Sequence, residues 1–502
     1  MNNEDNKLYD IAVIGMAVMG KNIALNIADN GFDVAIYNRT TSKAYKAAEE
    51  NPEQNLKVFE TVEDLVKNLK RPRRLLLMVK AGFAVDKFIE TLLPLLDEGD
   101  LIMDGGNSYF KDTQRRFEEL EAKGILYLGV GVSGGEEGAR RGPAIMPGGS
   151  RAAYDLVADI FDKISAKAAN GDSCQAYMGE GGAGHFVKMV HNGIEYADME
   201  LIAELYEMFK QNGKNNEEIA DIFENWNTGE LSSYLSEITV DILRTKDLEN
   251  PTLDLTEDKD SDMTTEIRNT GANNSSNYLI DHILDISEQK GTGKWTNEEG
   301  LELGVDLSIL YSGLNARYMS SAKELRVEAS KILPEGVDKE NALSTLDLNI
   351  EEIADAFLLA RLLAYAQGFS LYKAASAAHN WELDYESIAA TFRGGCIIRS
   401  YLLLPIMQAY HEDKNLSNLV LSPVFAETLA KGIPALRKLC SLTNLAGLSL
   451  PAFNAALSYY DALRTARSQA AMISAQRDYF GAHTYRRTDR EGIYHHEWTI
   501  NE

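Results

Sequence analysis

Five polar side chains recur at helical spacing between residues 184 and 196, in a segment that reads GHFVKMVHNGIEY. They occupy positions i, i+3, i+4, i+7 and i+8 and are Lys188, His191, Asn192, Glu195 and Tyr196. A helix would place all five on one face. Amine, imidazole, amide, carboxylate and phenol groups side by side can bind a polar substrate and exchange protons with it. The pattern therefore makes this helix the first candidate for an active site.

A solvated surface is the ordinary alternative for such a stripe. Against it, apolar residues occupy most of the remaining circumference, so that the stripe would face a cleft; they are Phe186, Val187, Met189, Val190, Ile194 and Met199.

A faint internal duplication also bears on the choice. Residues 196–197, 219–220 and 223 recur 169 positions later as Tyr-Ala, Ile-Ala and Phe. At this offset the five stripe positions hold Phe357, Ala360, Arg361, Ala364 and Tyr365. If the match is not a coincidence of an Ala-rich region, the helix can fold with apolar residues at three of the five positions, and a functional stripe is favoured.

The segment GMAVMG at 15–20 is similar to the dinucleotide fingerprint G-x-G-x-x-G, with Ala17 in the middle position. The first glycine allows a tight turn, a tiny second residue lets a pyrophosphate approach the backbone, and the third glycine lets the helix pack closely. A tight turn without a ligand is the alternative. Predicted strands at 9–14 and 34–37 flank a predicted helix at 21–30, and this order favours a cofactor site.

Asn38, Arg39 and Thr40 follow the second predicted strand. A carboxylate at this place would accept the ribose hydroxyls of NAD. A guanidinium and a hydroxyl suit a 2′-phosphate instead, because a planar cation can bind two of its oxygens. The sequence therefore predicts NADP as the cofactor, the alternative being a solvated arginine at a strand end.

Further small-residue loops follow later predicted strands. One holds Lys80 and Gly82, the next reads DGGNS at 104–108, and a third reads VSGGEEG at 132–138. Each could be a simple turn, but three loops meeting at one edge of a sheet are typical of a ligand site. Two more polar clusters, QKGTGKW at 289–295 and ARY at 316–318, could hold a phosphate.

The elements that must position these residues divide the chain into three parts. Strands are predicted at 9–14, 34–37, 75–79, 101–103 and 125–130, alternating with amphipathic helices as in a parallel sheet covered on both faces. Helical periodicity then continues to about residue 465. We expect an α/β Rossmann-like N-terminal domain at 1–182, a large all-α domain with internal duplication at 183–465, and an extended C-terminal tail at 466–502. An acidic stretch at 247–277 is predicted to be a solvated excursion.

Composition narrows the classes of partner. The 502 residues include 76 acidic and 50 basic side chains, for a formal charge of −26, which argues against nucleic acid or anionic membranes as partners. No apolar run is long enough to cross a bilayer. Three widely spaced cysteines and an N-terminus without a signal pattern predict a cytoplasmic protein. The histidines show no metal-site spacing, so we predict no metal.

Taken together, these motifs resemble those of the 6-phosphogluconate dehydrogenase family. The resemblance extends over nearly the whole chain through GxAxxG, NRT, VKAG, DGGNS, VSGGEEGAR, GHFVKMVHNGIEY, QKGTGKW and QRDYFGAH. It implies oxidative decarboxylation of 6-phosphogluconate to ribulose 5-phosphate with NADP, a step of the pentose phosphate pathway that needs no metal. It also implies a homodimer in which the C-terminal tail of one subunit reaches the other.

The resemblance assigns roles to single residues. Lys188 would be the general base for the C3 hydroxyl and Glu195 the general acid. The implied cofactor positions are Gly15, Ala17, Val18, Met19, Gly20, Asn38, Arg39, Thr40, Val79, Lys80, Ala81 and Asn107. The implied substrate positions are Asn107, Ser133, Gly134, Gly135, His191, Asn192, Tyr196, Lys290, Thr292 and Arg317, with Arg477 and His483 contributed by the tail of the other subunit. A lysine base must be neutral, so its pKa has to fall from its usual value of about 10.4.

The chain departs from the family's spacing at one place, and two other classes of protein are alternatives to the predicted enzyme. The segment between residues 242 and 289 is longer than the family's usual spacing, and its acidity could alter access to Lys290 and Thr292. A related β-hydroxyacid dehydrogenase would oxidise a small acid without a phosphate, against which Arg317 and the QRDYFGAH motif argue. A non-catalytic NADP-binding sensor would not need an intact Lys188 and Glu195.

Overall fold

The computed structural model describes residues 7–247, 276–288, 291–338, 342 and 349–498. Its first part is a seven-stranded sheet with the strand order β3-β2-β1-β4-β5-β6-β7. The strands are β1 (Ile11–Ile14), β2 (Val34–Tyr37), β3 (Leu56–Val58), β4 (Arg74–Leu77), β5 (Leu101–Asp104), β6 (Leu126–Ser133) and β7 (Ala144–Gly149). All neighbours pair in parallel except β7, which runs antiparallel to β6. The strand order reverses between β1 and β4, where doubly wound sheets bind their ligands.

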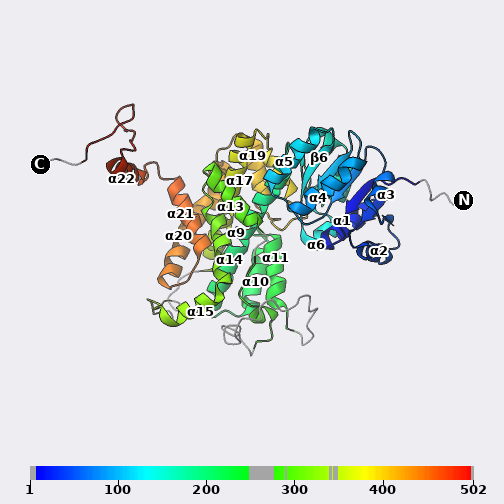
Figure 1. The fold of residues 1–502 in the computed structure, drawn as a ribbon. Coiled ribbons are helices and arrows are strands. Elements are labelled where there is room, and N and C mark those ends of the chain that lie inside the picture. Colours follow the sequence, from blue (N-terminus) through cyan, green and yellow to red (C-terminus); the bar gives the residue numbers. More distant parts are fainter. Residues whose placement is uncertain (1–6, 248–275, 289–290, 339–341, 343–348, 499–502) are drawn as a thin grey trace.

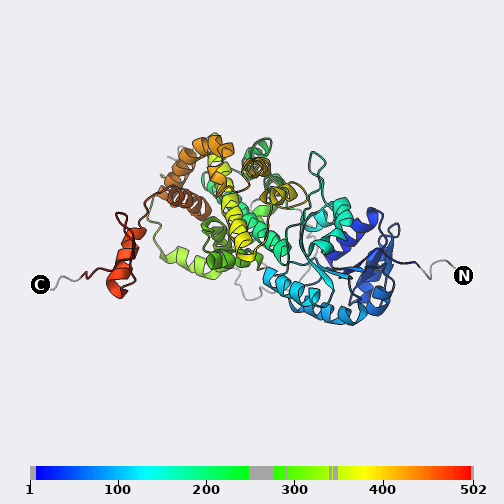
Figure 2. The same cartoon turned by 90° about the horizontal axis from the view of Figure 1, so that it is seen from above.

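Helices cover both faces of the sheet (Figures 1 and 2). Because strand side chains alternate, Ile11 and Val13 enter one apolar core while Ala12 and Ile14 enter the other. The first core is covered by α1 (Val18–Asp29), α2 (Thr41–Glu49), α6 (Gly135–Arg141), α7 (Arg151–Asp155) and α8 (Ala158–Ile164). The second is covered by α3 (Val62–Lys67), α4 (Phe83–Leu92) and α5 (Phe110–Glu121).

The five predicted strands are all present, with small shifts at their ends. The sequence does not predict β3 or β7. β3 is only three residues long and partly exposed. β7 contains Pro147, Gly148 and Gly149, which weaken the strand pattern and are tolerated at the edge of a sheet.

The second part of the chain is helical, as predicted, and surrounds one large apolar core. Its helices are α9 (Ala183–Gln211), α10 (Asn216–Trp226), α11 (Tyr234–Arg244), α13 (Thr292–Leu303), α14 (Ser308–Ser321), α15 (Lys323–Ile332), α17 (Ile350–His379), α18 (Tyr385–Thr391), α19 (Leu403–Glu412), α20 (Ala426–Leu445) and α21 (Pro451–Leu463). The long helices α9 and α17 pack against each other at the centre (Figure 1). None of the helices within the described ranges is both long and apolar enough to cross a membrane.

The predicted duplication is matched by helix boundaries. α10 begins at Asn216 and α18 at Tyr385, and α11 begins at Tyr234 and α19 at Leu403, so both pairs are 169 positions apart. The N-caps match as well, because Asn215 and its counterpart Asp384 each accept a hydrogen bond from the backbone N–H three residues later. The sets α9–α10–α11 and α17–α18–α19 therefore share one pattern. The predicted acidic excursion lies almost wholly outside the described residues.

The tail leaves the helical part and projects away from it (Figures 1 and 2). Its composition predicts an extended segment, but residues Ala470–Gly481 form a helix, α22. The segment after α22 folds back onto Asp478, whose carboxylate accepts hydrogen bonds from Trp498 Nε1 at 2.8 Å and from the backbone N–H groups of Thr484 and His496 at 3.0 Å. The composition predicts an extended tail, and the structure adds a helix and a fold-back that this buried acceptor organises.

Candidate active site

Glycines bring the first turns of α9 against the carboxyl-end edge of the sheet. A Cβ built at Gly184 of α9 would lie 2.5 Å from the carbonyl oxygen of Gly129 in β6 and from the backbone nitrogen of Gly148 in β7. A Cβ at Gly131 would lie 2.6 Å from the Cβ of Lys188. The helix therefore packs directly on the strand backbones, and Lys188 lies against β6 close to the strand's last residue, Ser133.

Lys188 is buried and hydrogen-bonded to neutral groups of its own helix. Its Nζ donates to Asn192 Oδ1 at 2.8 Å and lies 3.3 Å from His191 Nδ1. Burial lowers the pKa of Lys188, and the neighbouring Glu195 carboxylate opposes this shift. The thiol of Cys396 lies near as well, and burial raises the pKa of Cys396 to about 12, which keeps it uncharged. An amine in these surroundings is biased towards the neutral form that can accept a proton.

His191 connects α9 to the end of β6. Its Nε2 lies 3.2 Å from Ser133 Oγ, and its Nδ1 lies 3.2 Å from Asn192 Oδ1 and 3.7 Å from Glu195 Oε2. Burial, together with the nearby Lys188, lowers the pKa of His191 well below its usual range. The neutral imidazole can therefore offer one donor and one acceptor to the polar groups around it.

Asn192 and Tyr196 extend the stripe to the helices beyond α9. Asn192 Nδ2 donates to Thr292 Oγ1 at 3.0 Å, and Thr292 is the first residue of α13. The guanidinium carbon of Arg317, on α14, lies 3.6 Å from the centroid of the Tyr196 ring. Stacking on the ring places this cation beside the stripe. The side chain of Glu195 is one-fifth exposed, so the stripe opens to solvent at this point.

The predicted cofactor residues gather at the ends of β1, β2, β4 and β5. Gly15 has φ +107°, and a Cβ at Gly20 would fall on the Gly15 carbonyl oxygen, so both positions require glycine. Asn38 Oδ1 accepts a hydrogen bond from the Met16 N–H at 2.9 Å, which ties the fingerprint loop to the end of β2. Arg39 beside it is exposed.

The remaining predicted cofactor positions lie on the same turns and strand ends: Ala17, Val18, Met19, Thr40, Val79, Lys80, Ala81 and Asn107. A glycine cradle with an exposed guanidinium at the second strand end fits NADP, because a side chain would fill the cradle and a cation complements a 2′-phosphate.

The structure brings most of the predicted substrate residues around the stripe. Gly134 and Gly135 follow Ser133 directly, both with positive φ, and begin α6. Thr292 and Arg317 join from the helical part. Lys290 lies outside the described residues. Within the described ranges, no group of three or more His, Cys, Asp or Glu side chains is arranged to hold a metal ion.

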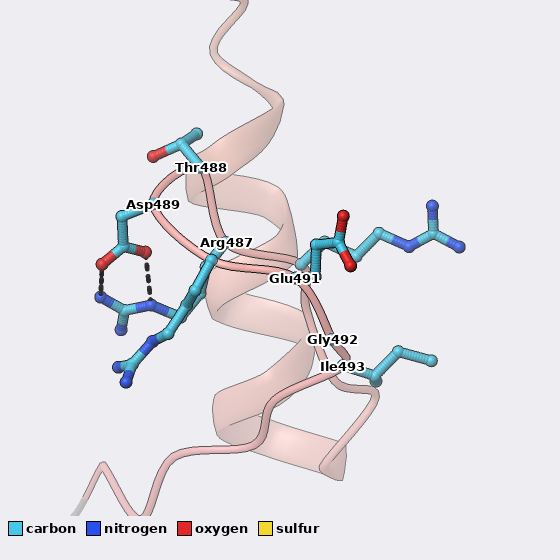
Figure 3. Close-up of a pocket in the computed structure, with 8 residues that line it drawn as sticks. Arg487, Thr488, Asp489, Glu491, Gly492 and Ile493 are labelled. Atoms are coloured by element: carbon cyan, nitrogen blue, oxygen red, sulfur yellow. Dashed lines mark hydrogen bonds and ion pairs between the residues drawn. The ribbon is translucent and has the colours of Figure 1, made fainter.

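The two predicted tail residues are not part of this cluster. Arg477 lies on α22 and His483 just after it, in the segment that projects away from the rest of the chain (Figures 1 and 2). The tail also contains a cavity of about 620 Å³ lined by residues 486–493. Figure 3 shows this cavity with Arg487 paired to Asp489, and Arg487 Nε lies 2.8 Å from Asp489 Oδ1. This cavity contains none of the predicted site residues, so we do not assign it to the active site.

The sequence analysis missed His185, one turn before Lys188. Its Nδ1 lies 2.7 Å from Thr113 Oγ1 on α5, and burial lowers its pKa. Its spacing of three residues before Lys188 places it on the same helix face, a signal that was present in the sequence. Its contact with α5 attaches the site helix to the loop that carries Asn107.

The chain matches known proteins over nearly its whole length. A family model described as the NAD binding domain of 6-phosphogluconate dehydrogenase matches residues 10–179, and one described as 6-phosphogluconate dehydrogenase, C-terminal domain, matches residues 184–498. The chain is 49% identical over 490 residues to the decarboxylating 6-phosphogluconate dehydrogenase of Escherichia coli strain K12, with 97% of this chain and 98% of that protein covered. It is 48% identical over 489 residues to the NADP(+)-dependent, decarboxylating enzyme of Bacillus subtilis strain 168, with the same coverage.

A solved structure is similar over the same extent. It is the 6-phosphogluconate dehydrogenase of Plasmodium falciparum, described in its apo form, with its cofactor NADP+ and with its substrate 6-phosphogluconate. The match has a TM-score of 0.86 and 40% sequence identity and covers 97% of this chain and 100% of that chain.

Proposed function

The chain belongs to the 6-phosphogluconate dehydrogenase family, and from this premise we propose how its residues act on the substrate. It oxidises and decarboxylates 6-phospho-D-gluconate to D-ribulose 5-phosphate and CO2 with NADP as the oxidant, in the pentose phosphate pathway. The observation that carries the residue assignment is the buried Lys188, held by Asn192 on a helix that faces Ser133 and the ends of the parallel strands.

The N-terminal sheet holds the cofactor. The backbone between Gly15 and Gly20 receives the pyrophosphate, and Arg39 with Thr40 binds the 2′-phosphate. When bound, NADP supplies the electron acceptor for the hydride that leaves C3 of the substrate. Lys80 and Asn107 lie in the loops that follow β4 and β5, at the same edge of the sheet as the fingerprint loop.

Lys188 removes the proton from the C3 hydroxyl. Its neutral amine takes this proton as C3 becomes a ketone, and the lowered pKa supports the role because burial favours the neutral amine. Asn192 Oδ1, 2.8 Å from Nζ, fixes the amine in place. The resulting 3-keto acid loses CO2 because the ketone accepts the electron pair of the breaking bond.

Glu195 returns a proton to carbon. The enediol left after decarboxylation needs a proton at the carbon that was C2 of the substrate and becomes C1 of the product, and Glu195 lies two turns after Lys188 on the same face of α9. Its partial exposure lets it exchange protons with solvent between turnovers. His191 and Ser133, together with Gly134, Gly135 and Asn107, bind the substrate carboxylate and hydroxyls.

Cations at the far end of the stripe bind the substrate phosphate. Thr292 contributes a hydroxyl from α13 and Arg317 a cation from α14, with Lys290 two residues before Thr292 in the sequence. Several cations around one dianion let a chain of charge −26 hold an anionic substrate. Tyr196 supports this end through the stacked Arg317.

The chain acts as a cytoplasmic homodimer with three functional parts. Residues 1–182 bind NADP, residues 183–465 bind the substrate and dimerise, and residues 466–502 reach the site of the other subunit. The projection of α22 away from its own α9 supports this exchange, because Arg477 and His483 cannot then serve the stripe of their own chain without moving (Figure 1).

Mixing two inactive variants tests the exchange. Lys188→Ala retains an intact tail, and Arg477→Ala retains an intact α9. If the tail acts across the dimer, mixed dimers regain one complete site and activity returns after subunit exchange. Absence of any regained activity in verified mixed dimers would show that the tail serves its own subunit.

A single assay tests the reaction. The protein is mixed with NADP and 6-phosphogluconate, and NADPH absorbance is followed together with CO2 release. We expect one CO2 for each NADPH. Reduction without CO2 would indicate the related β-hydroxyacid dehydrogenase chemistry, and neither signal would indicate an NADP-binding sensor.

A further inference from the structure

Arg116 on α5 is one of the largest fully buried side chains of the protein, with 1% of its surface exposed. Its guanidinium binds Asp86 through two hydrogen bonds, Nε to Oδ1 at 2.8 Å and Nη2 to Oδ2 at 3.1 Å. Nη2 also donates to the carbonyl oxygen of Gly82 at 3.2 Å, and Nη1 to Asp104 Oδ2 at 3.4 Å. All three nitrogens of the fork are therefore engaged.

These partners lie at the ends of two different loops of the cofactor site. Gly82 ends the loop after β4, which carries Lys80 and Ala81, and Asp86 lies in the first turn of α4, directly after that loop. Asp104 is the last residue of β5 and precedes the loop that carries Asn107. The Asp104 carboxylate accepts hydrogen bonds from Ser108 Oγ at 2.6 Å and from the Gly106 N–H at 3.0 Å. One guanidinium therefore fixes the separation of the two loops.

The same helix attaches these loops to α9. Thr113, one turn before Arg116, contacts His185, and Gln114 Oε1 accepts a hydrogen bond from the Gly182 N–H at 3.0 Å, at the start of α9. α5 thus contacts both cofactor loops and the helix that carries Lys188. A buried guanidinium between two carboxylates is not needed for stability alone, since apolar side chains of similar volume at such positions often give an equal or higher free energy of unfolding.

We propose that Arg116 is a positioning residue, which holds the loops at 79–82 and 104–108 in register with each other and with Lys188. This inference rests on the proposed function, because it assigns those loops to the nicotinamide half of NADP and to the substrate. Arg116 touches none of the reacting atoms. It acts through Gly82, Asp86 and Asp104.

The neighbouring Arg115 provides a matched control. It binds the same Asp86 at 2.9 Å but is 45% exposed, and it also pairs with Glu119 on the same helix. Arg115→Lys therefore changes an arginine on the same helix that binds the same carboxylate. Among the described residues, Arg115 makes no hydrogen bond to Gly82 or Asp104, which Arg116 binds. Arg116→Lys keeps the buried charge but removes the fork that spans the two loops.

The experiment compares the two variants in turnover and in binding. For Arg116→Lys we expect kcat to fall about tenfold to a hundredfold and KM for NADP to rise, because small displacements of a reacting group are costly. Affinity for adenosine 2′,5′-bisphosphate, which represents only the Arg39 half of NADP, should stay within about twofold of the unmodified protein. If Arg116 merely stabilised the fold, the variant would lower the unfolding midpoint, but it would not weaken the binding of NADP more than that of adenosine 2′,5′-bisphosphate.

A second variant covers the case in which Arg116→Lys does not fold. Asp86→Asn alters a partly exposed carboxylate and weakens the same link from the loop side, so it should show the same separation of NADP and fragment affinity. The proposal is wrong if both variants match Arg115→Lys in kcat, KM and binding. Failure of the unmodified protein to reduce NADP with 6-phosphogluconate would instead refute the proposed function. The affinities for NADP and for adenosine 2′,5′-bisphosphate, measured by calorimetry, would still test the link between the loops.

Discussion

The two long central helices, α9 and α17, have nearly the same length and occupy the same place in the two halves of the duplication. α9 is 29 residues long and α17 is 30, and each is followed by two helices at matching offsets. They differ along one face. Where α9 has Lys188, α17 has Phe357, and where α9 has His191 and Glu195, α17 has alanines. Since both helices fold and pack, the polar face of α9 is not required by the architecture.

The one charged residue on the equivalent face of α17 shows what a structural charge looks like. Arg361 is buried and paired: its Nη2 donates to Asp198 Oδ2 at 2.8 Å, and its Nη1 donates to the Leu231 carbonyl at 3.0 Å. Lys188, by contrast, is held by an amide and an imidazole, and burial lowers its pKa. A charge that supports the fold is neutralised by a buried carboxylate, whereas an amine with the proposed role of a general base is left able to lose its proton.

Lys188→Met should break this comparison most strongly. It gives α9 an apolar residue where α17 has Phe357, and we expect kcat to fall roughly 10²–10⁴-fold because the general base is lost. NADP affinity, measured by calorimetry, should not change, because the role proposed for Lys188 is towards the substrate. The free energy of unfolding in urea should stay equal or rise, because a buried amine is replaced by an apolar chain. Full residual turnover would contradict the assignment of the base.

Asp198→Ala should have its main effect on stability. It leaves Arg361 buried without its carboxylate, which should lower the free energy of unfolding by about 3–5 kcal/mol. Urea denaturation measures this change. The double variant Asp198→Ala with Arg361→Leu serves as the control and should recover much of the loss, since no uncompensated charge remains. An unchanged unfolding midpoint in the single variant would show that the pair is not the structural counterpart that the comparison requires.

Phe357→Leu should sharpen the comparison from the side of α17. Phe357 is fully buried, so the smaller side chain should lower the free energy of unfolding by about 1–3 kcal/mol. Its position matches that of Lys188, yet kcat of the folded enzyme should not change. The paired measurements are the urea midpoint and NADPH formation at saturating substrate. A large loss of kcat with little loss of stability would mean that α17 also takes part in catalysis.

The sequence contained most of the site but not the contacts that assemble it. The stripe from Lys188 to Tyr196 and the Gly15 fingerprint could be predicted because local spacing fixes which side chains share a face or a turn. β7 could not, because the glycines that let α9 approach the sheet, such as Gly148, also remove the strand pattern. The strand alternation and the helical periodicity were enough for the fold class.

Long-range pairings were out of reach of the sequence for a different reason. The link from Arg116 to Asp86 and Asp104 joins segments that no motif connects, and only the folded sheet brings them together. Likewise, the helix α22 was hidden because its apolar residues, among them Met472 and Phe480, remain exposed in the single chain. Among the described residues, neither side chain belongs to an apolar core.

The smallest expected effect concerns the pH dependence of stability at His191. Its counterpart in α17 is Ala360, which does not titrate. Burial, with Lys188 beside it, lowers the pKa of His191 well below its usual value, so near pH 6 the unfolded chain binds a proton that the folded protein does not. Stability should therefore fall as the pH drops below about 6.5, with a slope of up to about 1.4 kcal/mol per pH unit from this group.

His185 adds to the slope in the same direction, because burial lowers its pKa too. His191→Gln should remove part of the slope between pH 7 and pH 5 in urea titrations. Equal slopes in His191→Gln and the unmodified protein would mean that the imidazole is charged in the folded state, and the polar face of α9 would then carry a structural charge like that of α17.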